Sequence, residues 1–214
     1  MKVDLVIDIE TLVDPVTASD VEAYMKEYEP PANYKTPEAI LRHREKTERE
    51  AVDKIASDRR FTIGGKRMVS AALGLVSYGT NSVEHIESWS GNDLLVITKG
   101  VVEYLNDYNE YRLIGWNHKR FDLPEIAKSF AKTGVRPKNK PSKWDLIDLC
   151  DFPFSKTKLK DAALAFGLSL SEFTGEDIAK LHHEENWEAI MDYNEHDVEI
   201  TGKLFLAAST IFTF

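Results

Sequence analysis

Residues 3–10 read VDLVIDIE, an apolar and largely β-branched run that closes on two acidic residues. The pattern predicts a buried strand over Val3 to Ile9. Side chains alternate along a strand, so Asp8 and Glu10 project from the same face. Two neighbouring carboxylates repel each other, and a hard divalent cation such as Mg²⁺ or Mn²⁺ removes that cost. The segment therefore suits a metal site, although an ordinary polar strand end is the alternative interpretation.

Apolar segments further along the chain predict the rest of the fold. Strands are expected at 68–78, 83–90, 111–116 and 144–149, and helices at 92–108, 123–132, 159–166 and 187–206. Residues 79–82 are expected to form a turn, Asn92 an N-cap, and Gly134 and Gly167 helix stops. An early antiparallel meander followed by βαβ units predicts an α/β fold with a mixed sheet flanked by helices. With 214 residues and 43% hydrophobic content, one domain is expected.

Residues 14–67 interrupt this pattern between the first two strands. Glu38 to Lys54 is helix-prone and charge-mixed, and the proline-punctuated segment EPPANYKTPE precedes it. We interpret residues 14–67 as a charged helical insertion within the single domain. It is either a solvated helical segment at the protein surface or a flap that reaches the substrate. In the second case Asn33, Tyr34 and Lys35 are candidate contacts.

Charge is unevenly distributed in this acidic chain, whose net charge is −9. Glu172 to Glu199 holds ten acidic residues and one lysine, whereas residues 132–143 hold five basic residues and no acid. These are Lys132, Arg136, Lys138, Lys140 and Lys143. This strip either carries a nucleic-acid strand or is a solvated loop. The single cysteine, Cys150, excludes an intrachain disulfide, and no signal-peptide core or apolar run of roughly 20 residues occurs. We therefore expect a soluble, cytoplasmic protein without membrane contact.

A second acid lies in GWNHKRFDLPEI, residues 115–126. Asp122 opens a predicted helix, and a helix N-cap would explain it without a metal. Asn117 and Phe121, however, place an amide and a ring near the carboxylate, where they could hydrogen-bond and stack a terminal nucleotide.

The C-terminal helix supplies the third motif. Tyr193 and Asp197 are spaced i, i+4 and share one helical face. A core tyrosine and a solvated acid are the alternative interpretation. His182, His183 and His196 show no zinc-ligand spacing.

Together, DIET at residues 8–11, N-x-x-x-F-D at 117–122 and Y-x-x-x-D at 193–197 resemble the three exonuclease motifs of the DnaQ-like DEDD superfamily, which has a ribonuclease H-like fold. Its four acidic positions match Asp8, Glu10, Asp122 and Asp197. Tyr193 matches the tyrosine of the DEDDy branch, and Asp192 stands where the DEDDh branch has histidine.

Within the DEDDy branch, the chain is most similar to the proofreading exonuclease domain of family B DNA polymerases, here without a polymerase. The segments KLKDAALAFGL (158–168) and MDYNEHDVEITGKLF (191–205) carry this likeness. PPANYKTPEAI (30–40) resembles stand-alone bacterial and phage relatives, which implies the cytoplasm of a bacterial or phage-infected cell. The insertion 14–67 has no counterpart in minimal members, and Lys128 lies near a helix position where many relatives have arginine.

The resemblance implies a two-metal 3′–5′ exonuclease that releases 5′-mononucleotides from the 3′ end of DNA, preferably single-stranded. Asp8, Glu10 and Asp197 would bind one Mg²⁺ or Mn²⁺, Asp8 would bridge to the second, and Asp122 would hold the second through water. Tyr193 would orient the attacking water. The implied nucleic-acid contacts are Thr11, Leu12, Asn117 and Phe121, with Tyr34 and Lys35 from the insertion.

Two alternatives stay open from the sequence. Ribonuclease D-type exoribonucleases share the DEDDy carboxylates, which do not sense a 2′-hydroxyl. The fold also serves non-catalytic nucleic-acid-binding or protein-binding modules. A replication or repair protein is a further candidate partner.

Overall fold

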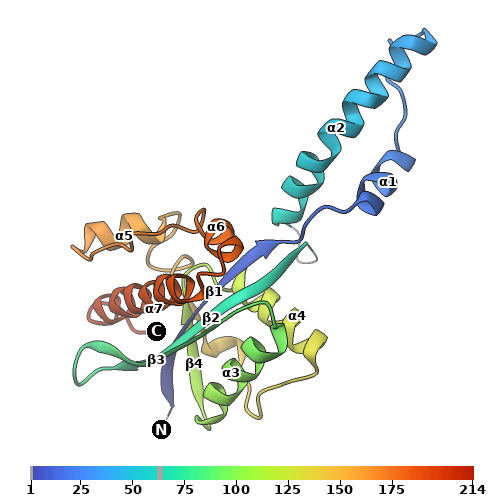
Figure 1. Cartoon of the computed structure of the whole chain (residues 1–214). Coiled ribbons are helices and arrows are strands. Elements are labelled where there is room, and N and C mark those ends of the chain that lie inside the picture. Colours follow the sequence, from blue (N-terminus) through green and yellow to red (C-terminus); the bar gives the residue numbers. More distant parts are fainter. Residues whose placement is uncertain (1, 62–64) are drawn as a thin grey trace. The chain divides into compact units, whose positions relative to one another are not determined.

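The computed structural model describes residues 2–61 and 65–214. The chain divides into two compact units. The first contains Met1–Leu12 and Met68–Phe214, and the second contains Val13–Arg67. Figure 1 shows the elements of both units.

A five-stranded sheet forms the centre of the first unit, in the order β3-β2-β1-β4-β5. Its strands are β1 (Val3–Val13), β2 (Lys66–Ser77), β3 (Ser82–Ser90), β4 (Tyr111–Gly115) and β5 (Leu146–Asp148). β2 and β3 are antiparallel, whereas β4 is parallel to both β1 and β5. The predicted α/β fold with a mixed sheet is therefore confirmed.

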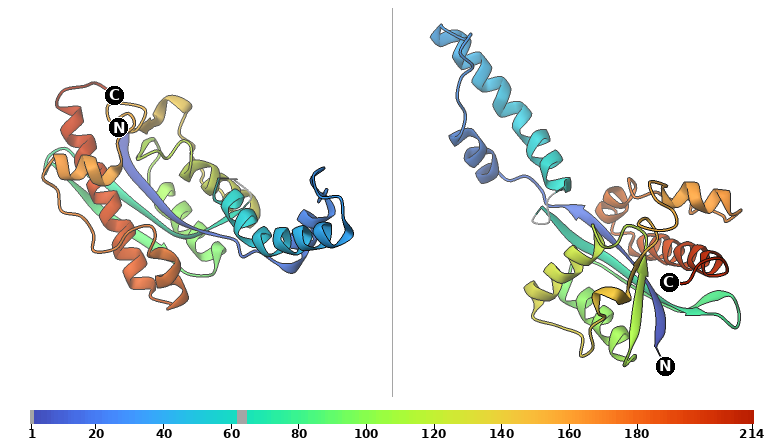
Figure 2. Two further views of the ribbon diagram at one scale, coloured as in Figure 1. Left: turned by 90° about the horizontal axis from the view of Figure 1, so that it is seen from above. Right: turned by 180° about the vertical axis from the view of Figure 1, so that it is seen from behind.

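Helices cover both faces of the sheet. They are α3 (Leu94–Asn106), α4 (Asp122–Thr133), α5 (Leu159–Ala165), α6 (Ile178–His183) and α7 (Trp187–Ser209). Figure 2 shows α3 and α4 on one face and α5 and α7 on the other. Among the described residues, no helix is long and apolar enough to cross a membrane.

The alternation of side chains along β1 divides the core into two layers. Leu5, Ile7 and Ile9 pack with Ile97 of α3 and other residues of that face. Val6 faces the opposite side, where it packs with residues of α5 and α7. Asp8 and Glu10 continue the even-numbered series and therefore face α7.

Several boundaries differ from the sequence-based expectations. The N-cap of α3 is Asp93, whose carboxylate accepts a hydrogen bond from the Leu95 amide at 2.8 Å, and not Asn92. The strand predicted at 144–149 shrinks to Leu146–Asp148, because a 3₁₀ turn over Lys143–Asp145, closed by a Ser142–Asp145 capping box, precedes it. The short helix α6 was not predicted. Gly134 and Gly167 end α4 and α5 as expected, with φ angles of 72° and 70°.

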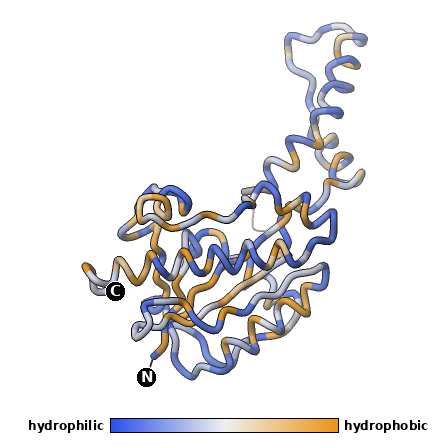
Figure 3. The backbone as a smooth tube through the Cα atoms, turned by 60° about the vertical axis from the view of Figure 1, so that its left-hand side comes forward, coloured by the Kyte–Doolittle hydropathy of each residue, from blue (hydrophilic) through white to orange (hydrophobic). Residues whose placement is uncertain are grey.

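The second unit consists of α1 (Ala18–Lys26) and α2 (Pro37–Phe61), which Figure 3 shows to be mostly hydrophilic. A capping box between Thr17 and Asp20 begins α1, which was not predicted. Arg59 of α2 pairs with Asp20 at 2.6 Å.

The loop between α1 and α2 contains the predicted contacts Asn33, Tyr34 and Lys35. Its Tyr34 ring packs on His43 of α2, with 4.6 Å between ring centroids. Residues 62–64 of the predicted insertion 14–67 lie outside the described residues.

Candidate metal centre and active site

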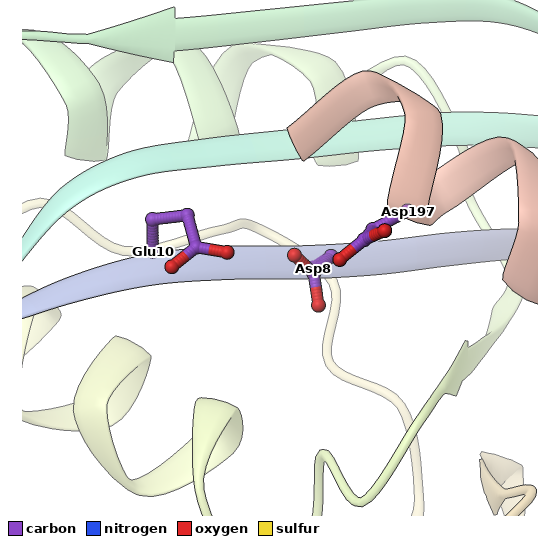
Figure 4. Close-up of side chains that lie close together, drawn as sticks. All are labelled: Asp8, Glu10 and Asp197. Carbon is purple, nitrogen blue, oxygen red and sulfur yellow. The ribbon is translucent and has the colours of Figure 1, made fainter. Parts of the chain in front are cut away.

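Three carboxylates from two elements meet on the α7 face of the sheet. Ligand oxygens of Asp8, Glu10 and Asp197 all lie within 4.8 Å of one another. Figure 4 shows Asp8 and Glu10 rising from β1 toward Asp197 of α7. The three are only half-buried, so the cluster opens to solvent. The structure thus brings together three of the four predicted ligands, from residues about 190 positions apart in the chain.

The electrostatics of this carboxylate cluster are unfavourable without a cation. Burial, and then the charges of Asp122, Glu10 and Asp197, hold the pKa of Asp8 well above its usual range. Burial and the charges of Asp197 and Asp122 do the same to Glu10. Burial also raises the pKa of Asp197 to about 6. A set of oxygen donors that repel one another is the environment in which a hard divalent cation is stabilised, so the residues fit Mg²⁺ or Mn²⁺.

Asp122 occupies the first position of α4 and is 9% exposed. The N-cap position belongs to Phe121, so the interpretation of Asp122 as a helix N-cap is wrong. Its charge acts on both Asp8 and Glu10, where it raises their pKa values. Asp122 therefore faces the same centre, although it lies outside the tight group of three.

Tyr193 lies one helical turn before Asp197, as the spacing predicts. Its hydroxyl is near Asp197 and offsets part of the burial effect on that carboxyl's pKa. Burial, followed by the charges of Asp197 and Glu10, raises the pKa of Tyr193 itself. The tyrosine therefore stays protonated at neutral pH and acts as a hydrogen-bond donor.

A cavity of about 500 Å³ opens beside Tyr193 and Asp197. The segment between α5 and α6 forms much of its wall, including Ser171, Phe173 and Thr174, and Lys158 and Lys160 stand at the start of α5. Cations and an aromatic ring next to the carboxylates give this cavity the character of a site for a phosphate-containing ligand.

The predicted nucleic-acid contacts lie outside the carboxylate cluster. Thr11 and Leu12 follow Glu10 on β1, and Leu12 packs in the cluster that contains Phe173. Asn117 adopts a left-handed φ of 59° in the loop before α4. Phe121, at the end of that loop, is 46% exposed. Tyr34 belongs to the second unit, as does Lys35.

Asn194 is a site residue that the sequence analysis did not identify. It is fully buried, and its Nδ2 donates to Asp8 Oδ2 at 2.5 Å. Its Oδ1 accepts from the Ser70 hydroxyl of β2 at 3.0 Å. Ser70 thus fixes the orientation of the amide, and the amide fixes Asp8. An amide three residues before Asp197 on one helix is the signal that would have indicated it.

Asp148 is the second residue that the sequence analysis missed. At the end of β5, its carboxylate accepts from the backbone N–H groups of Asn117, Lys119 and Cys150 at 2.8, 3.0 and 3.0 Å. Burial alone would raise the pKa of Asp148, but the nearby His118 ring, whose Nδ1 lies 3.6 Å from Oδ2, and these amides lower it on balance. Asp148 therefore holds the loop that leads to Asp122.

Comparisons with known proteins agree with this geometry. A structure of the family B DNA polymerase from the hyperthermophilic archaeon Pyrobaculum calidifontis matches with a TM-score of 0.57 at 14% identity. The match covers 99% of this chain and 24% of the polymerase, so the chain spans about a quarter of that protein's length. Comparison with curated protein sequences gave no significant match.

A family model described as the RNase_H superfamily matches residues 64–208, a range that includes Asp122, Tyr193 and Asp197. This match confirms the predicted ribonuclease H-like fold. The model covers well over half of the sequence, and the chain belongs to the RNase_H superfamily.

Proposed function

We propose that the chain is a metal-dependent 3′–5′ exonuclease that removes 5′-mononucleotides from single-stranded DNA. The observation that carries this proposal is the meeting of Asp8, Glu10 and Asp197 within 4.8 Å, with Tyr193 next to Asp197 on the wall of an open cavity. Carboxylates that need a cation, next to a protonated tyrosine, suit phosphodiester hydrolysis and serve no packing role.

Divalent cations in such a centre supply Lewis acidity and neutralise charge on the phosphate. Asp8, Glu10 and Asp197 would hold one cation, and Asp122, with Asp8, would hold the second. Tyr193 would orient the attacking water through its hydroxyl. Phe121, exposed beside Asp122, would support the terminal nucleotide by stacking.

The choice of DNA rests on likeness rather than on the carboxylates. One of the solved structures that match the chain belongs to a DNA polymerase, and the C-terminal segments resemble the proofreading exonuclease of that class. The carboxylates themselves do not distinguish deoxyribose from ribose. RNA is therefore an outcome that the experiment must separate.

The test uses two oligonucleotides of one sequence, one DNA and one RNA, each labelled at the 5′ end. We expect Mg²⁺- or Mn²⁺-dependent shortening of the DNA and no shortening when its 3′ end is blocked by phosphate. Degradation of RNA alone would replace the DNA proposal with an exoribonuclease. Binding of either strand without hydrolysis in any metal would indicate a non-catalytic module.

A further inference from the structure

The basic loop, residues 132–143, carries a row of exposed cations. Lys132, Arg136, Lys138, Lys140 and Lys143 are all exposed. Within residues 2–61 and 65–214, none of the five forms an ion pair with a carboxylate. In a chain of net charge −9, five cations left without an acidic partner in one segment mark a surface for a polyanion.

The loop is held in a fixed shape that directs these cations outward. From Gly134 to Ser142 exposure alternates, so that Arg136, Lys138 and Lys140 are exposed and the residues between them are half-buried. The half-buried Asn139 is tied down twice, because its carbonyl accepts from the Tyr111 hydroxyl and its amide donates to the Tyr108 carbonyl. The Lys138 backbone N–H donates to Asn106 at 2.8 Å. The cations of the loop are therefore held in position before a ligand binds.

An exposed aromatic ring follows this row. Trp144 is 81% exposed, and Lys143 Nζ lies 4.7 Å from its ring centroid. Burying so large a ring would be favourable, yet it stands in solvent beside cations. Cations next to an exposed aromatic side chain are the combination that binds single-stranded nucleic acid through phosphates and base stacking.

Topology places the loop at the opposite end of the sheet from the carboxylate cluster. Lys2, just before β1, pairs with Asp145 just after the loop, whereas Asp8 lies six positions further along the strand. At ~3.3 Å per residue this separation is about 20 Å. The helix α4 joins the two regions, since it begins at Asp122 and ends beside the loop.

An apolar cleft of about 360 Å³ follows α4 on the face of the sheet opposite to the carboxylate cluster. Its walls run from Leu123, next to Asp122 in sequence, past Ala127 and Phe130 to Arg136 and Lys140 of the loop. The cleft thus offers an apolar surface for bases or sugars directly beside the cations of the loop.

From these observations we infer that the basic loop and Trp144 form a second nucleic-acid contact, which holds the strand several nucleotides from its 3′ end. The inference rests on the proposed nuclease function and lengthens the stretch of strand that the protein contacts. The regular row of cations and the stackable Trp144 favour a nucleic-acid strand over an acidic protein segment.

The test compares Lys138→Ala/Lys140→Ala with the matched control Lys99→Ala/Lys180→Ala, whose lysines are also exposed. Affinity for single-stranded DNA of about 20 nucleotides is measured in EDTA, where hydrolysis cannot interfere. At about 0.1 M salt we expect the loop variant to bind at least ~10-fold more weakly, with a salt slope lower by roughly 1.4 because two phosphate contacts are lost. The control should match the wild type, and Trp144→Ala should weaken binding without changing the slope.

The second measurement is the dependence of KM and kcat on the length of the DNA. In Mg²⁺ the loop variant should show a raised KM and an unchanged kcat on the long strand, and no change on a strand of about 4 nucleotides, which cannot reach the loop. Wild-type affinity and salt slope in the loop variant would overturn the second contact and leave the nuclease proposal intact. An equal loss on short and long strands would also overturn it. Failure of the nuclease proposal is seen separately, as absence of hydrolysis by the wild-type chain.

Discussion

Asp8 is the residue on which most interactions of the site converge. It accepts a hydrogen bond from Asn194 and is repelled by Asp122, Glu10 and Asp197. Without a bound cation, a carboxylate with this many negatively charged neighbours contributes little to the stability of the fold. Its position is explained by the cation that it would share between two sites.

Removal of this carboxylate should therefore abolish catalysis, whereas loss of the tyrosine hydroxyl should only weaken it. We expect Asp8→Ala to lower kcat by at least about 10³-fold and Tyr193→Phe by about 100-fold, since the role proposed for Tyr193 is only to orient water. Single-turnover hydrolysis of single-stranded DNA measures both. An Asp8→Ala protein that keeps the wild-type rate would exclude a role for this centre.

Asn194 should affect metal binding rather than the chemical step. Without its amide, Asp8 loses its fixed orientation, and we expect the half-saturating Mg²⁺ concentration of Asn194→Ala to rise about 10- to 100-fold. Saturating metal should restore most of the rate. Asn109→Ala, a change to an exposed asparagine, is the control. An unchanged metal dependence in Asn194→Ala would show that the hydrogen bond has no such role.

The sequence could predict the motif residues but not the residues that position them. Asp8, Tyr193 and Asp197 are identified by type and local spacing. Asn194 and Asp148 act through hydrogen bonds that span 186 and 31 residues. The spacing of Asn194 from Asp197 marks the amide but not its partner Asp8, and no local pattern indicates Asp148.

At the scale of elements, the loop between β4 and α4 depends on Asp148 from the neighbouring strand. Replacement by alanine leaves the backbone N–H groups of Asn117 and Lys119 without this acceptor. We expect Asp148→Ala to lower the free energy of unfolding by about 3 kcal/mol, measured by urea denaturation. Asp151→Ala removes an exposed carboxylate that pairs with Lys119 at 3.1 Å, and it should change stability by less than ~1 kcal/mol. Equal effects of the two substitutions would argue against the bracing role of Asp148.

Helices and strands with a clear periodicity of apolar residues were predicted well, and short ones were not. β1 and α7 carry clear alternation or a long apolar face, and both were found at the expected place. α6 has six residues and β5 has three, too few for a period to show. The strand expected at 144–149 was too long because Trp144, its predicted first residue, stands in solvent beside Lys143.

At the scale of the whole molecule, the carboxylate cluster makes stability depend on pH and metal together. The pKa values of Asp8 and Glu10 are raised well above their usual range, and that of Asp197 to about 6. The folded chain therefore holds extra protons. Stability from these groups is fully present below their unfolded pKa values, near 4, and is lost as pH rises through their raised pKa values, which for Asp197 is about 6.

In EDTA we thus expect the melting temperature to rise when pH falls from 7 to 5. Added Mg²⁺ should raise it at pH 7 and much less at pH 5, because protons then compete with the cation. Asp197→Asn should diminish both effects. The range stays above pH 5 because carboxylates with lowered pKa values, such as Asp145 and Asp148, act in the opposite sense at more acidic pH. A melting temperature that falls between pH 7 and 5 in EDTA would contradict the repulsion in the cluster.

The overall architecture was predicted more completely than the organisation into units. The mixed sheet and its flanking helices follow from patterns within each segment. The interpretation of residues 14–67 as an insertion stays a prediction, although the second compact unit, Val13–Arg67, has nearly the same bounds. Its substrate contacts Tyr34 and Lys35 likewise stay predictions.

The nuclease proposal is tested most directly by incubating 5′-labelled single-stranded DNA with Mg²⁺ and either the wild-type chain or Asp8→Ala. The wild type should produce a ladder that shortens from the 3′ end and disappears in EDTA, and Asp8→Ala should leave the strand intact. No ladder with the wild type, or the same ladder with Asp8→Ala, would show that the carboxylate cluster does not hydrolyse DNA.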